Sequence, residues 1–77
     1  MNKESLKRAN ELSAMIIEAE DALSALDMYN WLEVRTNCTT YTVSNFLSDE
    51  SLDKIYLLLR DSLKEELKRM HEEFENL

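Results

Sequence analysis

The sequence contains neither glycine nor proline in its 77 residues. Both residues are costly in helix interiors, so their absence favours long helices. It also excludes a glycine-rich phosphate loop and a dinucleotide-binding fingerprint, because those motifs need glycine where the backbone approaches the phosphates. A chain of 77 residues without a flexible linker makes at most one domain, so we expect a single domain over residues 1–77.

Cysteine and histidine occur once each, as Cys38 and His71. One cysteine excludes an internal disulfide, and one cysteine with one distant histidine does not form a zinc site. Neither residue has the partners in sequence that a catalytic constellation requires. We therefore expect no metal, no cofactor and no enzymatic activity. A domain this small, without disulfide or metal, is often stabilised by oligomerisation instead.

Basic residues are few: nine Lys and Arg stand against sixteen Asp and Glu, which gives a net charge of −7. This balance disfavours direct binding to nucleic acid, because phosphate contacts need clustered Lys and Arg. It disfavours docking on an anionic membrane for the same reason. The N-terminal segment lacks the apolar core of a signal peptide, and no apolar run approaches membrane-spanning length. We expect a cytoplasmic protein.

Helical periodicity begins directly after Asn2, which is a suitable N-cap. Apolar residues recur at alternating steps of three and four, which is a heptad seam and predicts a helix over residues 3–29. Ile17 lies off this seam. The seam consists of Ala9, Leu12, Ile16, Ala19, Leu23 and Leu26.

A second helix is predicted over residues 49–76, after the N-cap Ser48. Its first half is apolar nearly all round, because Ile55, Leu57 and Leu58 lie off the main seam. A helix of this kind is covered on more than one side. One antiparallel helix cannot provide that cover, so the middle segment or a second subunit must. The main seam consists of Leu52, Tyr56, Leu59, Leu63, Leu67, Met70, Phe74 and Leu77.

The only β-like stretch, residues 31–44, lies between the two helices. Apolar and polar residues alternate along both of its arms, and β-branched and aromatic residues dominate, which predicts a single hairpin. An isolated hairpin is marginal in water, and its outer edges offer unpaired backbone groups. The hairpin therefore favours an assembly of several copies.

Two registers of this hairpin place the apolar side chains on one face. A two-residue turn pairs Val34 with Tyr41, whereas a four-residue loop over residues 37–40 pairs Val34 with Val43. We favour the longer loop, because Cys38 in a two-residue turn tolerates a positive φ poorly.

The predicted fold class is α+β and mostly α: a long helix, a β-hairpin and a second long helix, with the helices antiparallel. We expect a dimer or higher oligomer, in which the apolar first half of the second helix forms the interface. The interface residues that we predict are Ile55, Tyr56, Leu58, Leu59 and Leu63.

Arg35 is the only basic residue between Arg8 and Lys54. An arginine among threonine hydroxyls and aromatic rings is able to hold a phosphate or stack on a base, so it marks a candidate site for an anionic nucleotide. The alternative is an ordinary cross-strand polar surface. The candidate ligand-binding residues are Arg35, Trp31, Thr40, Tyr41 and Thr42.

Acidic residues of the first helix lack basic neighbours, because no Lys or Arg follows Arg8 in that helix. They are the better candidate for contact with a basic protein partner. This predicted acidic partner face consists of Glu18, Glu20, Asp21 and Asp27.

Two passages, TYTVSNFLSDESL and LKEELKRMHEEFENL, give the chain a layout that resembles short, acidic accessory proteins encoded by bacteriophages. The resemblance implies a protein that binds and disables a host component, either a protein or a small signalling nucleotide. We therefore rank an oligomeric interaction module that binds a host defence protein first. The alternatives are a protein that sequesters an anionic nucleotide between subunits, and a structural or regulatory dimer.

Overall fold

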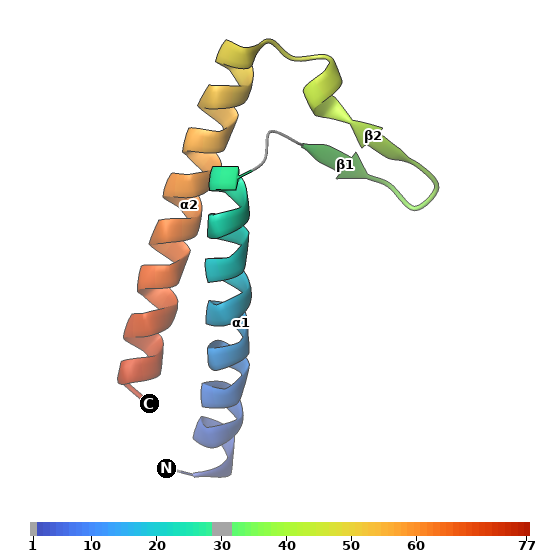
Figure 1. Ribbon diagram of the computed structural model, residues 1–77. Helices are drawn as coiled ribbons and strands as arrows, with labels where there is room; N and C mark the ends of the chain where they lie inside the picture. Colours follow the sequence, from blue (N-terminus) through green and yellow to red (C-terminus); the bar gives the residue numbers. More distant parts are fainter. Residues whose placement is uncertain (1, 29–31) are drawn as a thin grey trace.

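A computed structural model describes residues 2–28 and 32–77 of the chain. Two long helices lie side by side and antiparallel, and a two-stranded hairpin projects from the end where the chain passes between them (Figure 1). This is the predicted arrangement of helix, hairpin and helix. The elements in chain order are α1 (Lys3–Met28), β1 (Glu33–Arg35), β2 (Thr40–Thr42), the short 3-10 helix η1 (Val43–Asn45) and α2 (Asp49–Glu75).

Both helices begin at the predicted caps. The Asn2 Oδ1 atom accepts a hydrogen bond from the Ser5 N–H at 2.7 Å. The Ser48 Oγ atom accepts one from the Ser51 N–H at 3.2 Å. Such bonds satisfy amide groups that have no partner inside the first turn of a helix. The predicted C-terminal end of α2, residue 76, lies one residue beyond the observed end at Glu75. The predicted end of α1, residue 29, lies outside the described residues.

The core lies between the helices, along the two predicted seams. Leu12 is completely buried, whereas Ile17, which the periodicity places off the seam, is 59% exposed. The later seam residues of both helices are half-buried or exposed, so the core is narrow. The buried apolar residues are Ala9, Leu12, Ile16, Leu52 and Tyr56.

The hairpin has the two-residue turn, with Val34 opposite Tyr41, so our preference for the four-residue loop is wrong. No described residue has a positive φ, so the turn avoids the strain that we expected at Cys38. The Thr36 side chain explains the turn: its Oγ1 atom accepts hydrogen bonds from the N–H groups of Cys38 and Thr39 at 3.3 and 3.0 Å. Threonine hydroxyls support turns by such local bonds.

The molecule is a thin, elongated body of 50 × 28 × 15 Å. Its radius of gyration is 16.1 Å, whereas a compact domain of this length has a value of about 11.5 Å. The cause is visible in Figure 1: no further element covers the outer faces of the two helices, and the hairpin extends away from them. One copy of the chain therefore has only a single layer of paired helices.

Candidate interaction surface

Large apolar side chains are exposed around the hairpin and the start of α2. Phe46, in the connector before α2, is 84% exposed, Leu58 is 68% exposed and Leu57 is 56% exposed. Val34 of β1 and Tyr41 of β2 are 52% and 54% exposed. We call these five residues the apolar hairpin end.

The sequence explains why these residues meet solvent together. Val34 and Tyr41 lie opposite each other in the register, so they share one face of the hairpin. Leu58 follows two residues after the buried Tyr56 on α2 and is exposed, whereas Leu57 lines a pocket with Leu26 and Asp27 of α1 and is still more than half exposed. The hairpin does not cover them, since both are more than half exposed. We predicted that the first half of α2 packs against more than one antiparallel helix, and within one copy of the chain it does not.

The structure divides the predicted interface residues into two groups. Tyr56 is 7% exposed and belongs to the core between the helices of one copy. Ile55 and Leu63 are half-buried, whereas Leu59 is 37% and Leu58 68% exposed. Sequence reasoning did not select Phe46, Val34, Tyr41 or Leu57 for this surface. For Tyr41 and Phe46, the sequence feature that indicates this surface is the uncharged run over residues 36–48 in a strongly acidic chain.

The predicted ligand-binding residues do not all lie on one face of the hairpin. Arg35 lies opposite Thr40, and Thr42 lies opposite Glu33, so these four residues share a face. Tyr41 lies on the other face with Val34. Trp31, the remaining predicted residue, lies outside the described residues. Cys38 is exposed at the turn.

The predicted acidic partner face is partly neutralised by α2. The Asp27 Oδ1 atom lies 2.6 Å from Nη2 of Arg60, and the Glu20 Oε1 atom lies 3.7 Å from Nε2 of His71. Glu18 and Asp21 are exposed. Within residues 2–28 and 32–77 neither of these two carboxylates has an ion pair.

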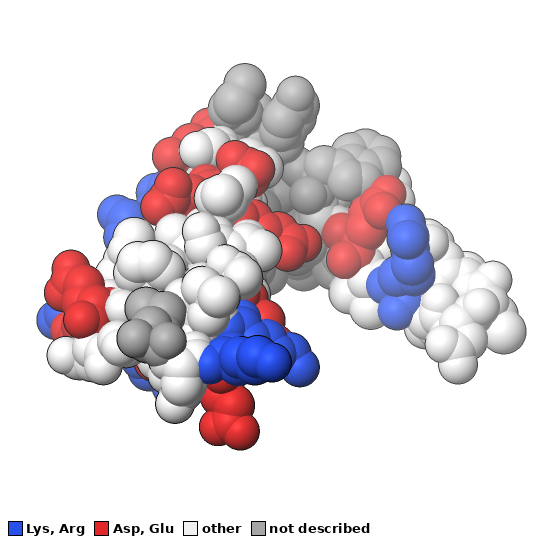
Figure 2. Space-filling view, turned by 90° about the horizontal axis from the view of Figure 1, so that it is seen from below, with Lys and Arg blue, Asp and Glu red and all other residues white. Residues whose placement is uncertain are grey.

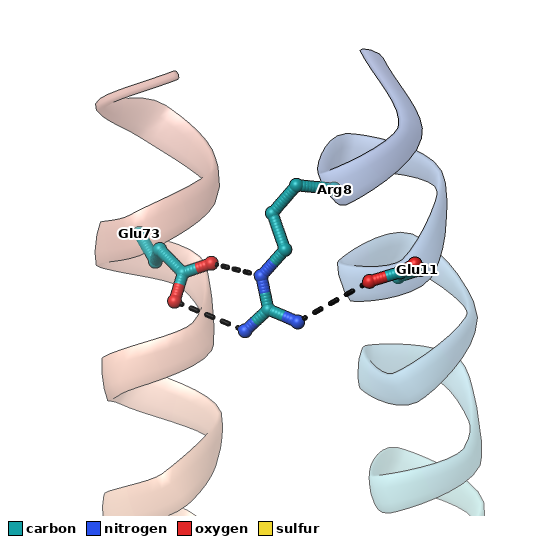
Figure 3. A network of polar contacts seen from close by, with 3 residues as sticks. All are labelled: Arg8, Glu11 and Glu73. Atoms are coloured by element: carbon teal, nitrogen blue, oxygen red, sulfur yellow. Dashed lines mark hydrogen bonds and ion pairs between the residues drawn. The ribbon is translucent and has the colours of Figure 1, made fainter. Parts of the chain in front are cut away.

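Charged side chains of both signs cover the helix pair, whereas the tip of the projecting hairpin is uncharged (Figure 2). The strongest ionic contact joins the helices near the chain termini, where Arg8 donates to both carboxylate oxygens of Glu73 at 2.6 and 3.1 Å (Figure 3). Glu11 lies 3.5 Å from the same guanidinium. The hydrogen bond from Arg8 lowers the pKa of the Glu73 carboxyl, and the same bond raises the pKa of Arg8.

A polar pocket of about 380 Å³ lies between the end of α1 and the first half of α2. The hydroxyl of Tyr56 and the Nε atom of Arg60 are buried there without a hydrogen-bond partner among the described residues. Asp27 and Asp53 also line it. The guanidinium of Arg60 donates hydrogen bonds, the two carboxylates accept them, and the phenol of Tyr56 does both, so the pocket suits an ordered water.

Within the described ranges, no group of three or more Asp, Glu, His or Cys side chains is placed to bind a metal ion. In the same ranges, neither helix is long and apolar enough to cross a membrane. No protein-family model, curated protein or solved structure matches this chain. The functional proposal therefore depends on the surface itself, and above all on the apolar hairpin end.

Proposed function

We propose that the protein is a non-enzymatic interaction module that self-associates, with the apolar hairpin end as the contact between copies. The observation that carries this proposal is the exposure of its five apolar side chains, from 52% at Val34 to 84% at Phe46. Where such side chains form one patch, they mark a site of protein association. Burial of such surface is the main favourable term in most protein–protein association.

The accessible surface supports a second copy of the chain as the partner. One copy exposes 6371 Å², whereas a compact monomer of the same mass exposes about 4,900 Å². The difference of about 1,500 Å² exceeds the roughly 800 Å² per partner that a standard interface buries. A standard interface between two copies therefore removes roughly half of this excess from each copy.

The distribution of charge supports contact at the hairpin end. Two copies with a net charge of −7 each repel one another. The run over residues 36–48 carries no Asp, Glu, Lys or Arg, and it includes Tyr41 and Phe46. Copies that meet through this run avoid like charges at close range, whereas the two helices would bring carboxylates together.

Size-exclusion chromatography with light scattering tests the proposal. We expect the wild-type chain to be a dimer at about 50 μM, because an obligate module of this kind buries a standard interface. Leu58→Glu places a charge in the contact, and we expect it to raise the dissociation constant of the dimer about a hundredfold or more. The matched control is Leu6→Glu, which alters a leucine that is 54% exposed in the first turns of α1.

A wild-type chain that is monomeric at this concentration contradicts the proposal. So does a dimer that Leu6→Glu weakens as much as Leu58→Glu does, because the contact would then lie on the helix faces rather than at the hairpin end. Circular dichroism at matched concentrations shows that both variants keep their helices.

Glu18 and Asp21 favour a second candidate function, binding of a basic protein partner by the assembled module. They are exposed carboxylates without an ion pair in the described part of the chain, whereas Glu20 and Asp27 of the same predicted face contact α2. A host defence protein, as the resemblance to phage accessory proteins implies, is one partner of this chemistry. Sequestration of a nucleotide stays a prediction, for which the shared face of Arg35 and Thr40 is the support.

A further inference from the structure

The outer edge of β2 has main-chain groups that point away from β1. The Thr36 N–H donates to the Thr39 carbonyl at 2.8 Å, so this pair is a hydrogen-bonded pair of the ladder. Hydrogen-bonded and non-hydrogen-bonded pairs alternate along antiparallel strands. Tyr41 is therefore hydrogen-bonded to Val34, and the N–H and C=O groups of Thr40 and Thr42 point outward. No turn or loop hydrogen bond uses the N–H groups of Thr40 and Thr42 or the carbonyl of Thr40 within the described residues. The Thr42 carbonyl is the N-cap carbonyl of η1, so one of its two lone pairs accepts the first hydrogen bond of that 3-10 helix.

The edge of β2 also lacks the features that protect exposed strands. Charged side chains, proline and bulges normally prevent an edge from pairing with another chain. β2 has the sequence Thr-Tyr-Thr, without charge or proline, and threonine and tyrosine both favour strands. β1, in contrast, carries Glu33 and Arg35. The protected edge of the hairpin is thus β1, and the unprotected edge is β2.

We propose that β2 pairs antiparallel with β2 of a second copy about a two-fold axis at Tyr41, which forms a four-stranded sheet in the order β1, β2, β2, β1. This inference depends on the proposed self-association and names the edge and register that produce it. The sequence Thr-Tyr-Thr reads the same in both directions, so an isologous contact is self-complementary.

The register follows from the outward groups. With Tyr41 on the axis, Thr40 lies opposite Thr42 of the second copy, and each such pair exchanges two N–H···O=C bonds. The outward groups of Thr40 and Thr42 then make four hydrogen bonds between the two copies, in which each Thr42 carbonyl uses its second lone pair. A shift of the strands by two residues leaves part of them unpaired. The two Tyr41 side chains, each 54% exposed in one copy, then cover one another on the face that also carries Val34.

Cysteine cross-linking decides between the two edges of the hairpin. In a Cys38→Ser background, Tyr41→Cys places two Cα atoms about 4.5 Å apart across the axis, within the range of about 4.4–6.8 Å that a disulfide needs. Val34→Cys is the matched control, because Val34 lies opposite Tyr41, on the same face, and is 52% exposed. In the proposed sheet the two Val34 positions are three strand spacings apart, about 14 Å.

With a mild oxidant, we expect Tyr41→Cys to form covalent dimer at least about tenfold faster than Val34→Cys. Faster cross-linking of Val34→Cys overturns the inference in favour of the β1 edge. If neither variant cross-links while the wild-type chain is still a dimer, the edge inference fails and the proposed self-association stands. A wild-type monomer removes both.

A proline variant tests the same edge without cysteine. Thr42 has φ −85°, which is close to the value that proline requires, and its N–H points outward. Thr42→Pro therefore removes two intermolecular hydrogen bonds from the dimer and no bond within the hairpin. We expect it to weaken dimerisation about tenfold or more, whereas Thr42→Val, which keeps the N–H, leaves it within about threefold. Equal dimerisation of the two variants contradicts the inference.

Discussion

At the scale of single residues, Tyr56 combines deep burial with a hydroxyl that has no partner among the described residues. Its ring is part of the core, so the sequence pattern that selected it as apolar is correct. The hydroxyl, however, has no hydrogen-bond partner among the described residues, and a buried polar group that stays unpaired reduces stability. Sequence periodicity cannot foresee this, because it depends on which atoms the folded chain brings near.

We therefore expect Tyr56→Phe to leave the free energy of unfolding unchanged or to raise it by up to about 1 kcal/mol. Urea denaturation followed by circular dichroism measures the change. Tyr41→Phe alters an exposed tyrosine and is the control for loss of a hydroxyl elsewhere. A loss of more than about 1 kcal/mol in Tyr56→Phe would show that the hydroxyl has a partner in solution, for which a bound water in the polar pocket is the candidate.

Glu73 gives a prediction of pH dependence. Its hydrogen bonds from Arg8 lower the pKa of the carboxyl below its ordinary value of 4.5 in the folded chain. The unfolded chain then binds protons more readily, so the contribution of Glu73 to stability is fully present above about pH 5 and is lost as the pH falls through the lowered pKa. Both side chains are partly exposed, so the effect is small and decreases with salt.

We expect Glu73→Gln to lower the thermal midpoint slightly at pH 7, and we expect this difference to shrink as the pH falls through the lowered pKa of Glu73. Glu72→Gln alters the adjacent carboxylate, which has no ion pair with another described residue, and it should show little difference over the same pH range. A deficit in Glu73→Gln that does not shrink as the pH falls would contradict the assigned role of the charge.

At the scale of elements, the ends of both helices follow from local chemistry. Asn2 and Ser48 are caps by virtue of short polar side chains before periodic segments, and both caps were predictable. The hairpin shows the limit of such reasoning. Its two registers are equally consistent with the alternation of apolar residues, and the Thr36 hydroxyl selects the two-residue turn by bonds that the pattern does not contain.

The negative charge of the predicted acidic partner face on α1 depends on contacts with α2. The ion pair with Arg60 reduces the exposed negative charge at Asp27, and Glu20 contacts His71, so Glu18 and Asp21 carry the predicted attraction for a basic partner. We expect Glu18→Lys with Asp21→Lys to reduce capture of basic proteins from a cell lysate by about tenfold, and more at low salt.

Quantitative mass spectrometry of the captured proteins measures this effect. Glu65→Lys with Glu72→Lys makes the same change of charge on the exposed face of α2 and is the matched control. Equal loss of capture in both double variants would mean that net charge alone attracts the partners. Unchanged capture in the first double variant would exclude the acidic face of α1 as the contact.

At the scale of the whole molecule, one copy of the chain is incomplete as a globular domain. Its radius of gyration of 16.1 Å exceeds the roughly 11.5 Å of a compact domain, and its most exposed large apolar side chains, Phe46 and Leu58, belong to the apolar hairpin end. The proposed sheet of two hairpins removes the unpaired edge and brings the two apolar hairpin ends together. The proposed self-association and the fold of the single chain would then answer one physical need, the burial of apolar surface.

The two helices, their caps, the hairpin between them and the excess of apolar residues at the start of α2 all follow from local patterns in the sequence. These properties depend on neighbours within a few positions along the chain, and apolar periodicity reports such neighbours directly. The register of the hairpin, the ionic contacts of Arg8 and Arg60 across the helices, and the exposure of Phe46 and Leu57 became known from the folded chain alone. Those properties depend on how two segments distant in sequence face one another, and the pattern of either segment alone does not contain that information.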